Sequence, residues 1–168
     1  MKTSNRYFWA AVVSLVICGS TFSQSNIVDK QIQARLIGVW QDSSAVGSGL
    51  TDTFHLFADG NYKFNYNQMD GTKRILSHSG KWKIVGGEFV LNIIEVEMLI
   101  GGKWVKASGS TATEFEIDGG KTITKNILPV EKFTLSIGPF IEEDIHLTTE
   151  IDKIKYWKLS DDPTAYQN

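Results

Sequence analysis

The sequence predicts an all-β protein: an antiparallel, up-and-down β-barrel of eight to ten strands with a short N-terminal helix. Asp-Gly and Gly-Gly pairs recur along the chain, and they allow the positive φ angles that tight hairpins need. Between these pairs apolar and polar residues alternate with period two, as in strands that bury one face. Closure into a barrel would remove the two edges of so long a meander. A two-sheet sandwich is the alternative, but Greek-key sandwiches need long crossings, and most connections here are tight.

The first 23 residues have the features of a secretory signal peptide. A basic start is followed by an apolar run from Tyr7 to Cys18, which is too short to span a membrane, and small residues precede a cleavage point after Ser23. We therefore expect export to the periplasm or the extracellular space. The alternative is a lipid anchor on Cys18, where the preceding Ile17 is bulkier than the small residue usual in bacterial lipoproteins.

Residues 24–160 are the right length for one domain, and residues 161–168 are expected to form a flexible tail. The signal contains Lys2 and Arg6 and no acidic residue, so its removal changes the formal net charge from −2 to −4. A mildly acidic domain gives no electrostatic reason to expect nucleic acid or an anionic membrane as a partner. We expect no membrane-spanning segment after signal cleavage. The only cysteine leaves with the signal, so we expect no disulfide.

The first element of the domain is a helix over residues Asn26 to Leu36. Asn26 can cap it, and its apolar residues Ile27, Val28, Ile32 and Leu36 fall near one face. We expect two or three turns that end near Gly38.

Strands follow in order, each with one apolar face. The residues expected to share a buried face are Tyr62, Phe64 and Tyr66; Trp82 and Ile84; Phe115 and Ile117; and Phe133, Leu135 and Ile137. The run from Phe89 to Met98 is apolar on both faces at its centre, which indicates a bulge or cover by another element. Gly138 and Pro139 interrupt the pattern, and strands resume near residues 145–149 and 154–159.

Three segments follow one another along the chain, and their order carries a family resemblance. They are Leu36-Ile37-Gly38-Val39-Trp40, then Phe54 to Phe64 with Asp59-Gly60 at its turn, then Gly80 to Gly87. Together they resemble the lipocalin-like domains of small exported bacterial proteins, within the calycin group. The clear similarity covers Leu36 to about Leu91, and the rest agrees in strand pattern only.

The resemblance implies that the N-terminal helix closes one end of the barrel and that Trp40 plugs this end, with Gly38 letting the chain pass close beneath. It also implies a cation late in the chain, stacked on the tryptophan. Lipocalins usually carry an arginine there, but the last arginine is Arg74, so Lys153, Lys155 or Lys158 would take its place.

The aromatic residues of the inner face are the most informative functional feature. Barrels of this size either fill with side chains or hold one small apolar ligand. We expect a secreted lipocalin-like protein that binds a small hydrophobic molecule inside the barrel, with a wall formed by Tyr62, Phe64, Tyr66, Phe133 and Leu135. The alternative is a non-catalytic interaction or structural module with a packed core that acts through its outer surface or loops, and its protein partner is unknown.

No motif of the sequence points to catalysis or to a cofactor. A G-x-S-x-G elbow is absent, so the serines of the glycine-rich turns are expected to be solvated. His55, His78 and His146 could form a zinc site only if folding brought them together, since no short H-x-H or H-x-x-x-H spacing links them. We therefore expect neither an enzyme nor a metal protein.

Overall fold

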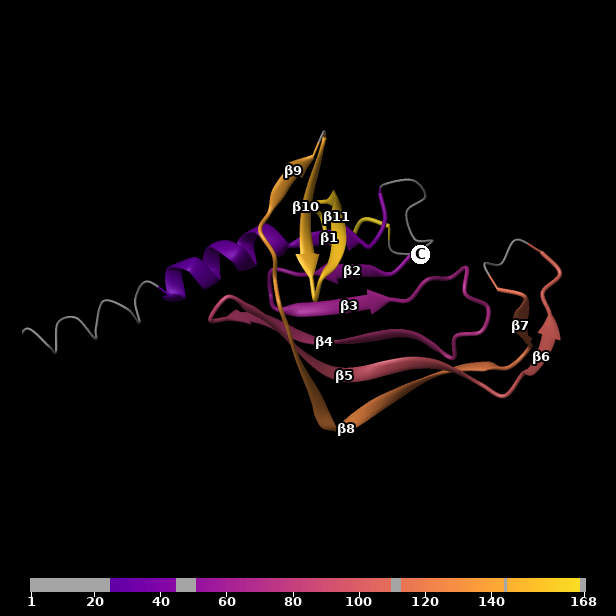
Figure 1. Cartoon of the computed structure of the whole chain (residues 1–168). Helices are drawn as coiled ribbons and strands as arrows, with labels where there is room; N and C mark the ends of the chain where they lie inside the picture. The colour runs from indigo at the N-terminus through magenta and orange to yellow at the C-terminus, as the bar shows by residue number, and fades with distance from the viewer. Residues whose placement is uncertain (1–24, 45–50, 110–112, 144, 167–168) are drawn as a thin grey trace, which may run out of the picture.

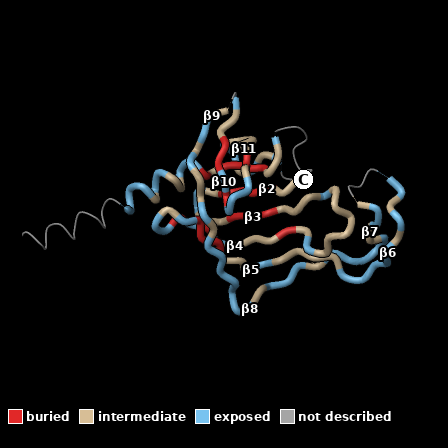
Figure 2. The backbone as a smooth tube through the Cα atoms, in the orientation of Figure 1, coloured by how far each residue is buried: buried red, intermediate tan, exposed pale blue. Residues whose placement is uncertain are grey.

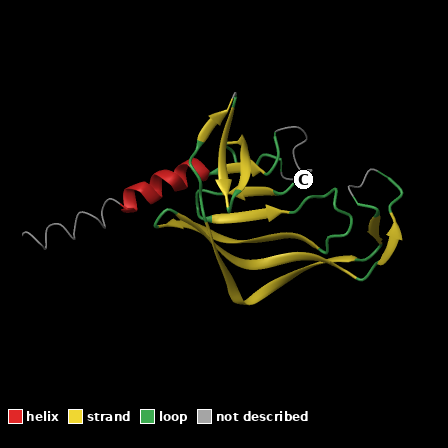
Figure 3. Ribbon diagram, viewed as in Figure 1, coloured by secondary structure: helices red, strands yellow, loops and turns green. Residues whose placement is uncertain are grey.

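The structure, a computed structural model, describes residues 25–44, 51–109, 113–143 and 145–166. Residues 25–36 are helical, as expected, and the rest of the described chain is mainly strand (Figure 3). The strands are β1 (Gly38–Gln41), β2 (Thr53–Leu56), β3 (Asn61–Asn65), β4 (Ile75–Val85), β5 (Glu88–Ile100), β6 (Lys103–Lys106), β7 (Phe115–Asp118), β8 (Lys121–Leu135), β9 (Ile141–Glu143), β10 (His146–Ile151) and β11 (Ile154–Ser160). The expected signal peptide, with Cys18, lies outside these residues.

Nine strands form one antiparallel sheet in the order β8-β5-β4-β3-β2-β1-β11-β10-β9. Nearly every neighbour in this order is also a neighbour in sequence, so the chain forms a meander. The exceptions are β5 beside β8, where the β6–β7 hairpin is inserted, and β1 beside β11, where the two ends of the domain pair. Figure 1 shows the helix at one end of the curled sheet and β6–β7 at the other.

The predicted closure into a barrel is wrong, because no ladder joins the edge strands β8 and β9. The chain leaves β8 after Leu135, makes one bridge from Ile137 to Ile151 of β10, and continues into the three-residue β9. Hydrogen bonds from Gly138 N to Glu150 O (2.8 Å) and from Asp152 N to Ser136 O (2.9 Å) flank that bridge. The gap between the edge strands β8 and β9 is here called the seam. The chain itself crosses this seam, where a closed barrel would have a ladder between two strands.

Unequal strand lengths explain why the seam stays open. The strands β4, β5 and β8 have 11, 13 and 15 residues, whereas β1, β2 and β3 have four, four and five. The outer halves of the long strands therefore extend past the short ones and pair only with one another.

The β6–β7 hairpin forms a second, two-stranded sheet at the far end of the long strands. It brings the described strands to eleven, one more than the upper bound of the expectation. Its apolar residues are not in the core: Phe115 is 48% exposed and Trp104 57% exposed. The alternation of Phe115 and Ile117 thus marks a strand correctly, but not a strand of the main sheet.

Buried residues concentrate in the short strands β1 to β3, in parts of β4 and β5, and in β10 (Figure 2). The expected inner-face residues Tyr62, Phe64, Trp82 and Ile84 are at most 6% exposed. They pack in one cluster with Leu36, Trp40, Phe54, Leu56, Phe89, Leu91, Ile151 and Tyr156. By contrast, most residues of β8 are exposed.

Trp40 lies in the part of this core next to the helix. Its side chain is fully buried, and its Nε1 donates a hydrogen bond to the carbonyl oxygen of Leu36, the last helical residue, at 2.7 Å. Gly38 has φ +130°, and a Cβ there would lie 2.2 Å from the carbonyl oxygen of Ser160. Only glycine allows β1 to approach β11 this closely.

Lys158 is the lysine that lies over Trp40. Its Nζ is 5.6 Å from the centre of the Trp40 ring, and the two residues are partners in the β1–β11 ladder. The same Nζ donates a hydrogen bond to the carbonyl oxygen of Arg35 at 3.1 Å. A cation at this position therefore joins the end of the helix to the tryptophan.

Residues 161–166, part of the expected tail, fold into turns that lie against the outer face of β2. Nδ1 of His55 is 3.0 Å from the carbonyl oxygen of Pro163, and His55 is only 1% exposed. Burial lowers the pKa of His55. This contact covers a part of the outer face that would otherwise meet solvent.

Candidate functional site

A cavity of about 280 Å³ lies inside the curled sheet. Its walls come from β2, β3, β4, β5 and β8 on one side and from the β10–β11 hairpin on the other. The lining is mostly apolar and aromatic, which is typical of small-molecule sites. It consists of Asp52, Phe54, Phe64, Tyr66, His78, Leu91, Ile93, Phe133, Leu135, Ile151, Asp152, Ile154 and Tyr156.

The period-two pattern of the strands places these side chains on one face. Phe64 pairs with Phe54 on β2 and with His78 on β4, so the three side chains lie on the same side of the sheet. Leu91 pairs with Phe133 on β8 in the same way. The cavity is therefore an outcome of strand register, with no dedicated loop needed to build its main wall.

Four of the five residues predicted to form the wall line this cavity: Phe64, Tyr66, Phe133 and Leu135. Phe133 is nevertheless 44% exposed, because β8 is an edge strand. The cavity thus reaches the open seam between β8 and the β10–β11 hairpin.

Tyr62, the fifth predicted residue, is buried but does not line the cavity. Its hydroxyl group lies 3.0 Å from Nδ1 of His78, and the two rings meet edge to face. Tyr62 therefore supports the wall by orienting His78.

His78, which its sequence context suggests only as a possible metal ligand, also lines the cavity. Its ring stacks on Phe64 with centroids 4.9 Å apart and meets Tyr66 edge to face. Burial lowers the pKa of His78 to about 4, so the imidazole is neutral at pH 7. The sequence could have placed His78 on the inner face, because His78 lies an even number of residues from Trp82 and Ile84 in the same strand.

We expect His78 to make the stability of the protein depend on pH. Above its ordinary pKa of 6.5 the ring is neutral in both the folded and the unfolded state. As the pH falls from 6.5 to about 4, only the unfolded chain takes up the proton, so the free energy of unfolding decreases. We expect a loss of about 2 kcal/mol, somewhat less than the whole shift implies, because the ring keeps some solvent contact.

Denaturant unfolding between pH 7 and pH 4 measures this effect. His78→Gln, which cannot titrate but can still hydrogen-bond to Tyr62, should flatten the curve by about 2 kcal/mol. Tyr62→Phe is the matched control, because it keeps the imidazole and should keep the slope. Parallel curves for the wild type and His78→Gln would show that His78 titrates normally in the folded protein.

The structure separates the three histidines. His55 pairs with Lys63 while His78 pairs with Phe64, so the two imidazoles lie on opposite faces of the sheet. His146 lies on β10. Within the described ranges, no three His, Cys, Asp or Glu side chains are placed to hold a metal ion.

A larger hollow, of about 520 Å³, lies on the outer face of β2 to β5. Many of its lining side chains are polar or charged, among them Lys63, Asn65, Ser77 and Glu97. We place the candidate site in the smaller cavity, because its lining is mostly apolar and aromatic, which is typical of small-molecule sites.

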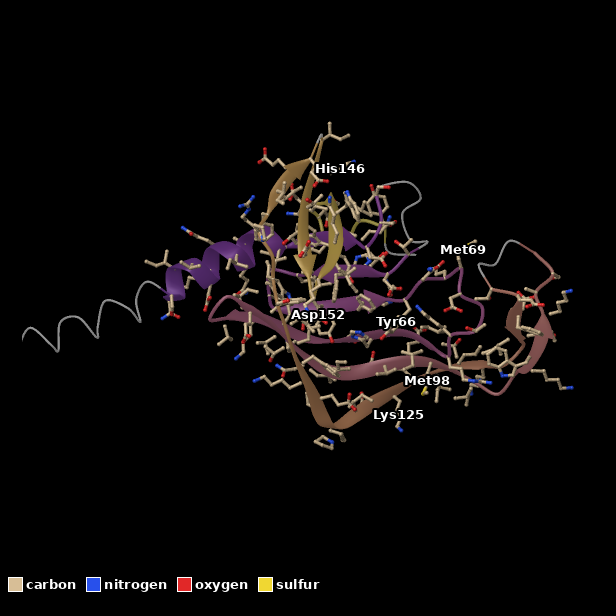
Figure 4. All side chains as sticks on the ribbon, in the orientation of Figure 1. Tyr66, Met69, Met98, Lys125, His146 and Asp152 are labelled. Carbon is tan, nitrogen blue, oxygen red and sulfur yellow. The ribbon has the colours of Figure 1, made fainter. Side chains whose placement is uncertain are left out.

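Polar side chains also line the inner cavity. They include Asp52, which precedes β2, Tyr66, which follows β3, and Asp152 in the turn between β10 and β11. Figure 4 labels Tyr66 and Asp152. Tyr156 of β11 also lines the cavity and is only 4% exposed. Nζ of Lys73 lies 3.6 Å from Asp52 Oδ1 and 5.0 Å from the centre of the Tyr66 ring.

The fold and this cavity define a class: a curled, antiparallel β-sheet protein with a small aromatic-lined interior site. Comparisons with protein families, with curated proteins and with solved structures returned no match to the chain. Of the residues that the structure describes, none belong to a helix long and apolar enough to cross a membrane.

Proposed function

We propose that this chain is an exported, lipocalin-like protein that holds one small apolar molecule inside its sheet. The observation that carries the proposal is the inner cavity, whose wall contains Phe64, Tyr66, Phe133 and Leu135. The meander order, the helix beside Trp40 and the cation over this tryptophan also support a lipocalin-like arrangement, in a sheet that stays open beside β8.

The cavity volume limits the size of the ligand. About 280 Å³ is just below the usual range for ligand pockets and roughly twice the volume of an engineered cavity that binds benzene. A one-ring or two-ring molecule fits this space, whereas a retinoid or a long-chain fatty acid would extend through the seam. We therefore expect ligands of about ten heavy atoms, with dissociation constants on the order of 10–100 μM.

Calorimetric titration with 2-phenylethanol and indole tests the proposal. Leu135→Trp should fill the cavity and weaken binding at least about tenfold. Leu128→Trp is the matched control on the same strand, because Leu128 is 85% exposed and does not line the cavity. Equal loss in both variants, or no heat of binding in the wild type at millimolar ligand, would contradict an interior site.

Export forms part of the same proposal, and the sequence of residues 1–23 supports it. N-terminal sequencing and mass measurement of protein from the native host test it. The expected product begins at Gln24. A product that begins at a diacylglyceryl-modified Cys18 would establish the lipid-anchored alternative, and an intact Met1 would contradict export.

A second candidate function, an interaction module that acts through its outer surface, is favoured by β8. This edge strand of 15 residues exposes Leu128 (85%) and Val130 (47%). If the chain is such an interaction module, Leu128→Lys should abolish binding to a partner that co-purifies with the wild type, and Leu135→Trp should not. The ligand-binding proposal predicts the reverse ranking for small-molecule affinity.

A further inference from the structure

His78 brings the only imidazole to the lining of the inner cavity among the described residues. Its partner in the β3–β4 ladder is Phe64, another lining residue, so both side chains project from the inner face of the sheet. The imidazole stacks on the Phe64 ring, with the centroids 4.9 Å and the planes 20° apart, and the rings of Tyr62 and Tyr66 meet it edge to face. Three neighbouring rings and one hydrogen bond therefore hold the imidazole in a fixed orientation.

The hydrogen bond to Tyr62 also determines which imidazole nitrogen carries the proton. The hydroxyl oxygen of Tyr62 lies 3.0 Å from Nδ1 of His78 and has no other partner among the described residues. If Nδ1 were the donor, the hydroxyl hydrogen of Tyr62, a residue only 2% exposed, would be buried without an acceptor, at a cost in stability. Both groups are satisfied only when the Tyr62 hydroxyl group donates to an unprotonated Nδ1. The proton of the neutral imidazole then lies on Nε2.

Burial favours the same protonation states. It raises the pKa of Tyr62, so the phenol keeps its hydrogen, and it lowers the pKa of His78 to about 4, so the imidazole carries a single proton at pH 7. Nε2 is on the edge of an imidazole ring farthest from Cβ, so on this inward-projecting side chain it is directed into the space that the ring lines. No described residue bonds to Nε2, and this atom is not fully enclosed. The cavity therefore offers an N–H donor to a bound molecule.

This donor distinguishes between ligands of one shape. A ligand that fills the cavity displaces water from the N–H group, and a purely apolar ligand leaves that group buried and unpaired. A neutral carbonyl oxygen supplies the missing acceptor and avoids the desolvation cost of an anion. The rings of Phe54, Phe64 and Phe133 in the lining favour an aromatic body for the same ligand.

We propose that the inner cavity selects small aromatic carbonyl compounds, whose carbonyl oxygen accepts a hydrogen bond from the Nε2–H group of His78. This selectivity rests on the function proposed above, because it concerns the same cavity. His78 is then the residue that determines specificity. Tyr62 is a positioning residue, since it acts on the ligand only by fixing the tautomer and the orientation of His78.

Acetophenone and α-methylstyrene test the selectivity, because they have the same shape and differ only in carrying a carbonyl oxygen or a methylene group at one position. Their hydration also differs, so the informative quantity is the ratio of their two affinities, compared between protein variants. In calorimetric titration we expect His78→Leu to lower the affinity for acetophenone about tenfold and to leave that for α-methylstyrene within about twofold of the wild type. Equal effects on the two ligands would overturn the inference. Binding of neither ligand to the wild type would instead contradict the proposed function itself.

His146→Leu is the matched control, because His146 on β10 does not line the cavity and the same change there should leave the ratio unaltered. His78→Leu leaves the Tyr62 hydroxyl group without its partner, so the double variant Tyr62→Phe/His78→Leu removes that buried group as well. We expect the double variant to show the same change of ratio. An unaltered ratio would mean that another group, such as the hydroxyl of Tyr66 or Tyr156, bonds to the carbonyl oxygen, and it would overturn the role of His78.

The tautomer has a readout of its own that needs no ligand. Long-range proton–nitrogen correlation spectra distinguish a protonated from an unprotonated imidazole nitrogen, and the signals of His78 are those missing from His78→Leu. At pH 7 we expect an unprotonated Nδ1 and a protonated Nε2, with the Nε2 resonance shifting further on addition of acetophenone than of α-methylstyrene. A proton on Nδ1 would overturn the assignment of His78 as the donor.

Discussion

Trp40→Ala is expected to lower the free energy of unfolding by about 3–5 kcal/mol, the largest effect of any single truncation that we foresee. Trp40 is fully buried, packs near Phe140 at 6.1 Å between centroids, and lies under the Nζ of Lys158. The change leaves a cavity and removes the donor to the Leu36 carbonyl oxygen. It also leaves the cation of Lys158 without its aromatic partner.

Trp104→Ala provides the comparison, because Trp104 is 57% exposed on β6 and should cost no more than about 1 kcal/mol. Both values come from urea titration followed by far-UV circular dichroism. Similar losses in the two variants would mean that Trp40 does not fill the end of the sheet next to the helix.

Gly80→Ala should cost about 3 kcal/mol or prevent folding, because the site has no room for a methyl group. A Cβ at Gly80 would lie 2.0 Å from the carbonyl oxygen of Asn92 and 3.0 Å from the backbone nitrogen of Ile94. Both are backbone atoms of β5, so neither can rotate away as a side chain would. Gly80 lies where the β4–β5 register shifts, opposite Tyr62 on β3.

Gly109→Ala is the matched control, since apart from its chain neighbours no heavy atom of the described residues lies within 4 Å of its ideal Cβ, and its φ is not in the left-handed region. We expect it to change the free energy of unfolding by less than about 0.5 kcal/mol. If Gly80→Ala proved equally silent in thermal or urea unfolding, the close approach of β4 and β5 at this position would be disproved.

Local chemistry made the strands and turns predictable. Glycine pairs mark the turns after β4 and β5, and period-two alternation alone assigns Phe64 and Trp82 to the inner face. The helix over residues 25–36 also follows from its own sequence. These features depend on neighbours in the chain, which is why a sequence pattern can identify them.

Closure of the sheet was not predictable in this way. It depends on how far β8 extends beyond the strands opposite and on where the chain leaves it, near Leu135. The alternating pattern of Phe133, Leu135 and Ile137 suggests a continuous strand, but the structure splits it between β5 and β10. Such a division is a long-range outcome that period-two alternation does not encode.

The candidate site was predictable in its apolar wall and not in its acidic lining residues. The period-two alternation of apolar and polar residues predicts the wall residues Phe64, Tyr66, Phe133 and Leu135. Asp52 and Asp152 line the cavity from positions outside the strands, directly before β2 and in the turn between β10 and β11. Their role depends on tertiary placement, so charge in the sequence alone gave no reason to single them out.

The central claim is that a small molecule binds inside the sheet, and nuclear Overhauser effects from bound 2-phenylethanol test it most directly. We expect contacts from the ligand ring to the methyl groups of Leu91, Leu135 and Ile151, which line the cavity. Contacts confined to Leu128 and Val130 on the exposed part of β8, or no contacts at saturating ligand, would contradict it.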